Sequence, residues 1–115
     1  MTQQIESGAS AKKHALNQMA FREVNERIAE LTADWRQTEM SLFVCECSNP
    51  RCAESLEITP AEYEWVRGDG ARFVVLNGHQ SREMERVVEG NGRFLIVEKI
   101  GSAAAIARDS DPRHA

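Results

Sequence analysis

The chain lacks long apolar runs and clusters of basic residues. It also has no cysteine outside one short stretch. No apolar run approaches the ~20 residues that a membrane-spanning helix needs. The 14 lysine and arginine residues are scattered among 18 acidic ones, which leaves a net charge of -4. We therefore expect neither a membrane helix nor the basic surface of a nucleic-acid-binding protein.

The first residues also lack the basic and apolar segments of a secretory signal. We therefore expect a soluble, cytoplasmic protein. In that compartment thiols stay reduced, and clustered cysteines more often bind metal or do redox chemistry than form disulfides. The 115 residues suffice for about one domain, and a domain of this size often needs a metal or another crosslink for stability.

All three cysteines, Cys45, Cys47 and Cys52, lie within eight residues. Residues two apart on a strand point to the same side, so the first two thiols can converge. The Ser-Asn-Pro-Arg segment that follows favours a chain reversal, which would bring Cys52 back beside them. His79 is the only histidine inside the predicted domain and is the favoured fourth ligand. A Cys3His set is a known structural zinc site, so we predict that these four residues bind zinc.

Several alternatives remain open at this site. Asp69, Glu46 or a water molecule could supply the fourth ligand, and iron could replace zinc. Glu46 lies between two cysteines on a predicted strand, so its side chain should point away from theirs into solvent. The cluster could instead act as a thiol or zinc redox switch, in which neighbouring thiols form a reversible disulfide. The plainest alternative is that the cysteines are small buried apolar residues.

The local patterns predict an α+β fold in which an N-terminal helix packs on a small, mainly antiparallel sheet with a metal-stabilised, zinc-knuckle-like corner. We expect a disordered tail over residues 1–15, one compact domain over 16–108 and a frayed C-terminus over 109–115. Residues 84–89 fit a strand or a helix, although the Gly-Asn-Gly that follows is typical of a hairpin. The other expected elements are helices at 16–35, from 60 and at 102–108, the last with a serine cap, and strands at 41–45, 54–59, 72–76 and 93–98.

The first predicted helix carries an apolar stripe, whose residues recur at spacings of three and four. The stripe consists of Phe21, Val24, Ile28, Leu31 and Trp35. It either packs on the helix's own domain or binds a protein partner or a second copy of the chain, as a short coiled coil does. Exposure of the stripe in the folded monomer would favour partner binding.

Several segments together resemble a family of small bacterial proteins of uncharacterised activity. They are Phe21 to Ile28, the Cys-Glu-Cys and Cys52 elements, Thr59 to Tyr63, Arg72 to Val75, Gly78-His79 and Val97 to Lys99. The resemblance covers roughly residues 20 to 100 and implies that the cysteines and His79 belong to one site, but it implies no activity. No acid–base constellation or catalytic signature accompanies the site. We therefore expect a non-enzymatic, zinc-stabilised regulatory or protein-interaction module of the bacterial cytosol.

Overall fold

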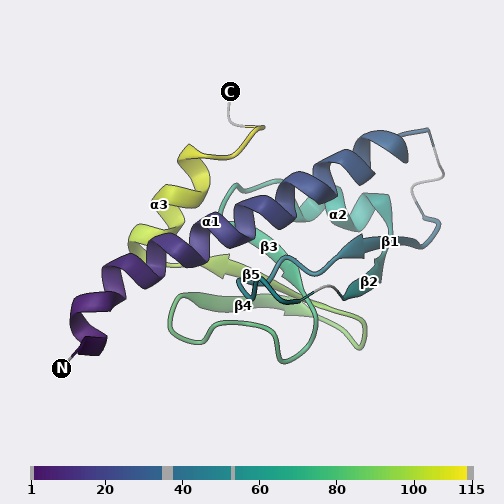
Figure 1. Cartoon of the computed structure of the whole chain (residues 1–115). Helices are drawn as coiled ribbons and strands as arrows, with labels where there is room; N and C mark the ends of the chain where they lie inside the picture. Colours follow the sequence, from purple (N-terminus) through teal and green to yellow (C-terminus); the bar gives the residue numbers. More distant parts are fainter. Residues whose placement is uncertain (1, 35–37, 53, 114–115) are drawn as a thin grey trace.

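The computed structural model describes residues 2–34, 38–52 and 54–113, with side chains from residue 16 onward. Three helices and five strands are assigned within these ranges, and Figure 1 shows the helices beside two small sheets. They are α1 (Thr2–Leu31), β1 (Ser41–Val44), β2 (Ser55–Ile58), α2 (Pro60–Val66), β3 (Arg72–Val75), β4 (Glu85–Gly90), β5 (Leu95–Lys99) and α3 (Gly101–Asp109). The predicted α+β class with an N-terminal helix and antiparallel sheets is confirmed.

Both sheets are antiparallel and are built from short strands. One consists of β1 and β2, and the other has the order β3-β5-β4 with β5 in the centre. Between β4 and β5, the Asn91 N–H donates to the Phe94 carbonyl at 3.0 Å, which closes the hairpin. Residues 85–90 therefore form a strand, not a helix, with a bulge between Val87 and Glu89.

The core is formed by the inward faces of the two sheets and one side of α2. Its largest apolar members are Phe43, Leu56, Ile58, Tyr63, Val66, Phe73, Val74, Val75, Phe94, Ile96 and Val97. The rings of Phe43 and Tyr63 stack with their centroids 4.6 Å apart, which packs β1 onto α2. Burial of these side chains is the main source of stability in a domain of this kind.

Of the two predicted helix caps, the one at α2 is confirmed and the one at α3 is wrong. Thr59 accepts a hydrogen bond from the Glu62 N–H at 3.1 Å, and Glu62 accepts one from the Thr59 N–H at 2.9 Å, so the expected capping box begins α2. The expected serine cap of α3 is wrong, because Ile100 occupies the cap position and makes no side-chain cap bond. Ser102 lies inside the helix, which begins at Gly101.

Helix α1 docks through a polar face. Its fully buried side chains include Gln18, Arg22 and Asn25, whereas the predicted stripe lies to one side. Val24 is 46% exposed and Leu31 is 76% exposed, and Phe21 and Ile28 are half-buried. The stripe is therefore not the face by which α1 packs on its own domain, although Ile28 touches the core. Trp35, the last member of the stripe, lies outside the described residues.

Both ends of the chain carry local structure among the described residues. Helix α1 begins at Thr2, where we expected a disordered tail; the segment is rich in Ala, Gln and Lys, which favour helix. Near the other end, where we expected fraying, Asp111 pairs with Arg67, and Arg113 pairs with Glu26. The division of the chain into tail, domain and C-terminal segment stays a prediction.

Among the described residues, no helix is long and apolar enough to cross a membrane.

Candidate metal centre

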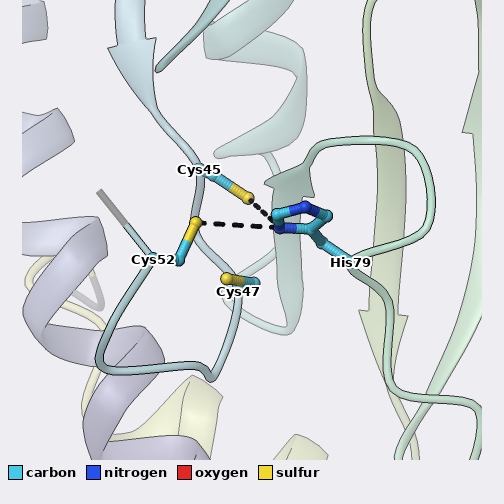
Figure 2. Close-up of side chains that lie close together, drawn as sticks. All are labelled: Cys45, Cys47, Cys52 and His79. Carbon is cyan, nitrogen blue, oxygen red and sulfur yellow. Dashed lines mark hydrogen bonds between the residues drawn. The ribbon is translucent and has the colours of Figure 1, made fainter. Parts of the chain in front are cut away.

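The four side chains proposed as ligands from sequence lie together. Cys45 and Cys47 follow β1, Cys52 follows the turn after them, and His79 follows β3. Figure 2 shows their side chains converging on one point. One ligand atom from each lies within 4.8 Å of every other, so the four residues are close enough to hold a metal ion.

Backbone hydrogen bonds place the two loops that carry these side chains. The Cys45 N–H donates to the Glu54 carbonyl at 3.0 Å, which continues the pairing of β1 with β2. The Cys52 N–H donates to the Asn49 carbonyl at 3.0 Å and closes the turn expected from the Ser-Asn-Pro-Arg segment. The His79 N–H donates to the Leu76 carbonyl at 2.9 Å, and the intervening Gly78 has φ of 89°. A positive φ suits glycine, so this turn directs His79 toward the thiols at low cost.

The His79 ring faces the thiols with one nitrogen and a carboxylate with the other. Its Nδ1 lies 3.6 Å from Cys45 Sγ and 3.7 Å from Cys52 Sγ (Figure 2). Its Nε2 lies 3.7 Å from an oxygen of the exposed Glu54 side chain. Metal-binding histidines commonly have an acceptor near the second nitrogen, and Glu54 lies in that direction from His79.

The three thiols have different environments. Cys45 and Cys47 are almost fully buried, and Cys52 is half-buried. The pKa of the Cys47 thiol is lowered to about 5, mainly by a hydrogen bond from Cys45. Hydrogen bonds from His79, the Asn49 backbone and Cys52 lower it further, whereas burial alone would raise it. The same contact with Cys47, and then burial, raises the pKa of Cys45. Burial is the largest cause that raises the pKa of Cys52.

A backbone donor also points at the cluster. The Leu76 N–H lies 3.3 Å from Cys45 Sγ and donates to it. Such a hydrogen bond stabilises negative charge on the sulfur. A cysteine sulfur carries that charge when it binds a metal. The cluster can therefore hold thiolates in a largely buried place.

Glu46 is fully buried, so the expectation that it is solvent-exposed is wrong. Its carboxylate accepts hydrogen bonds from Asn25 Nδ2 at 2.9 Å, from the Tyr63 hydroxyl at 2.8 Å and from the Val74 N–H at 3.0 Å. Burial raises the pKa of this carboxyl, and the three donors oppose the rise. Glu46 thus joins α1, α2 and β3 directly behind the cysteines.

Asp69, an alternative fourth ligand, belongs to a different contact. Its carboxylate accepts hydrogen bonds from Arg108 Nε at 3.0 Å and from the Ala71 N–H at 2.9 Å. The group of potential ligands found among the described residues contains His79 and not Asp69.

Comparisons with protein-family models, with curated proteins and with solved structures find no match to this chain.

Proposed function

We propose that Cys45, Cys47, Cys52 and His79 bind one zinc ion. Zinc takes a tetrahedral set of thiolate and imidazole ligands, with Zn–S of about 2.3 Å and Zn–N of about 2.0–2.1 Å. A tetrahedral angle between such bonds separates sulfur from nitrogen by about 3.5–3.6 Å. His79 Nδ1 lies 3.6 Å and 3.7 Å from two of the sulfurs, and this near agreement carries the proposal.

The ion would be structural. Four protein ligands fill a tetrahedral site and leave no open position for a substrate. The ion would fasten the loop after β1 to the loop after β3, which belong to different sheets. Zinc binding of this kind contributes directly to folding, so the proposal is a non-enzymatic module with a zinc-stabilised corner. Thiolate ligands also need a reducing compartment, which supports a cytoplasmic location.

The module would act by binding another protein chain through the stripe on α1. Exposure of Val24 and Leu31 in the monomer supports this proposal, because α1 already docks through its other face. The partner would be a different protein or a second copy of this chain. The stripe would be completed by Phe21, Ile28 and Trp35.

Native mass spectrometry of protein purified without chelator tests the metal. We expect one zinc ion per chain, and its loss in Cys47→Ser. That variant should unfold several kcal/mol more easily, because structural zinc contributes on the order of 10 kcal/mol to small zinc domains. Arg51→Ala, an exposed change in the same loop, is the control and should keep zinc. A metal-free wild type, with Cys47→Ser melting at the wild-type temperature, would contradict the proposal.

The same measurement with mild peroxide tests the alternative redox switch. One thiolate would attack peroxide, break its O–O bond and form a sulfenic acid with release of hydroxide. A second thiolate would displace the sulfenic oxygen as hydroxide and form the disulfide, and the two hydroxides would take up protons to give water while zinc is released. Only Cys52 of the three thiols is more than marginally exposed, so oxidation would begin there. Retention of zinc and a full set of reduced thiols would exclude the switch and leave a purely structural site.

Sedimentation velocity tests the stripe. If copies associate through it, Leu31→Asp should weaken association at least about tenfold while the fold is kept, since Leu31 is 76% exposed. Leu42→Asp, another exposed leucine outside the stripe, is the matched control and should have no effect. A monomeric wild type at all concentrations would exclude self-association and leave only a different protein as the partner.

A further inference from the structure

A pocket lies between α2 and the β4–β5 hairpin, on a surface distinct from the metal centre and the α1 stripe. It has a volume of about 240 Å³, and its lining includes Glu62, Trp65, Glu89, Gly90, Phe94 and Ile96. We infer that this pocket binds an arginine or lysine side chain of a partner protein.

The aromatic walls suit a flat or compact cation. The guanidinium of Arg72 lies over the Trp65 ring at 4.3 Å from its centroid, and Arg72 does not line the pocket. Trp65 lines the pocket and is 47% exposed, so part of its side chain stays accessible beside Arg72. The guanidinium of Arg93 lies 5.0 Å from the centroid of the Phe94 ring. Both aromatic rings thus already hold one cation by the attraction between positive charge and the ring face.

The carboxylates at the rim differ in availability. Glu62 is engaged by Arg93, whose Nη2 lies 3.0 Å from its oxygen. The exposed Glu89 side chain makes no hydrogen bond or ion pair with any residue that the structure describes. Glu89 is therefore the carboxylate free to pair with an incoming cation, while the nearly buried Phe94 and Ile96 offer apolar surface to its methylene stem.

The size and place of the pocket favour a side chain of a protein over a small molecule. Pockets for small-molecule ligands usually measure about 300–1,000 Å³, which is larger than this one. Glu89 and Gly90 belong to β4, which is one of the two edge strands of its sheet among the described residues. A polypeptide can lie along such a strand while one of its side chains enters the pocket. Arginine should bind better than lysine, because its guanidinium can stack on an aromatic ring and pair with a carboxylate at the same time.

The test titrates zinc-loaded, ¹⁵N-labelled protein with N-acetyl-arginine methylamide and follows chemical shifts. The matched control probe is N-acetyl-citrulline methylamide, which has almost the same shape and no charge. We expect saturable shifts for the Trp65 indole N–H and the Gly90 and Asn91 amides, and at least fivefold weaker binding of the citrulline probe. Equal binding of the two probes, or shifts spread over the whole surface, would overturn the inference.

Variants separate the pocket from general charge effects. Glu89→Gln should weaken binding of the arginine probe at least fivefold. Glu83→Gln removes the same charge from an exposed residue outside the pocket and should leave binding unchanged. An equal loss in both variants would show a non-specific charge effect and would overturn the inference. A final titration with tetramethylammonium distinguishes the source of the cation: binding as tight as that of the arginine probe would show a site for small organic cations and exclude a protein side chain.

Discussion

Each of the two ring nitrogens of His79 faces a potential partner. Its Nδ1 faces two thiols, and its Nε2 faces the Glu54 carboxylate at 3.7 Å. If His79 bound a metal through Nδ1, Glu54 would be the carboxylate that faces the N–H on the other ring nitrogen. We therefore expect the exposed Glu54 side chain to contribute to metal affinity.

Glu54→Gln should weaken zinc binding by about tenfold or more, because partners of metal-bound histidines typically contribute 10–100-fold in affinity. His79→Ala should weaken it further, since it removes a ligand. Competition with a chromophoric chelator measures both. Glu57→Gln, on the neighbouring strand β2 and also exposed, is the control and should retain wild-type affinity. Wild-type affinity in His79→Ala would remove this residue from the ligand set.

The proximity of the four candidate ligands was predictable from sequence, whereas the burial of the residue between two of them was not. Strand alternation and a turn are local features, and they were enough to bring Cys45, Cys47 and Cys52 together. The side-chain partners of Glu46 are Tyr63, 17 positions away, and Asn25, 21 positions away. No local pattern reports such partners, so Glu46 was expected in solvent. Its burial follows from the tertiary structure alone.

Helix α1 is hydrogen-bonded to the backbone of the segment that carries Cys45 and Cys47. Asn25 Nδ2 donates to the Val44 carbonyl at 2.8 Å, and Asn25 Oδ1 accepts from the Val44 N–H at 2.8 Å. Asn17 donates to the Ser48 carbonyl at 2.9 Å, and Gln18 donates to the Glu46 carbonyl at 3.1 Å. The position of α1 therefore depends on the conformation of residues 44–48.

This docking explains why the helix was predicted and its inner face was not. The buried residues Gln18, Arg22, Asn25 and Thr32 follow the helical period, but most lie one position after a member of the expected stripe. A shift of one residue turns the face by about 100°. Hydropathy marks apolar faces, and it gives no signal for a helix that docks by donating hydrogen bonds to buried carbonyl groups.

Removal of the metal should loosen α1 before the rest of the fold. Without zinc the 44–48 segment loses its fixed shape, and its carbonyl groups no longer match the donors on α1. Hydrogen exchange should then speed up at least about tenfold in residues 16–31, while β5 in the centre of its sheet changes less. Readdition of zinc is the control and should restore protection. An equal change in α1 and β5, or no change, would contradict this coupling.

A network of ion pairs joins the C-terminal segment to α1 and α2 and so connects distant parts of the whole molecule. The buried Arg67 pairs with Asp111 and lies 3.3 Å from Glu26. Arg113 pairs with Glu26 at 2.7 Å and with Glu64 at 2.8 Å. A buried cation that loses its partner is strongly destabilising, so the network stabilises the fold only while its carboxylates are charged.

Acid should weaken this network. Burial alone would raise the pKa values of Glu26 and Asp111, but hydrogen bonds and charges of Arg113 and Arg67 outweigh it and lower both pKa values below their ordinary range. A carboxyl with a lowered folded-state pKa contributes stability above its unfolded pKa of about 4 and loses it as the pH falls through the folded value. The contribution should therefore be complete at neutral pH and lost progressively below about pH 4.

Asp111→Asn tests this contribution through the free energy of unfolding in urea. At neutral pH the variant should be less stable than the wild type by about 3 kcal/mol, since Arg67 keeps only Glu26 as a partner. Below about pH 4 the unfolded wild-type chain takes up a proton at this carboxyl before the folded protein does, so the difference between the two proteins should shrink. Any zinc bound at the cysteine cluster would also be released by acid, but from both proteins, so the difference between them removes that effect. Asp109→Asn, an exposed neighbour, should match the wild type throughout. A difference that is the same at both pH values would show that Asp111 stabilises the fold by packing and not by its charge.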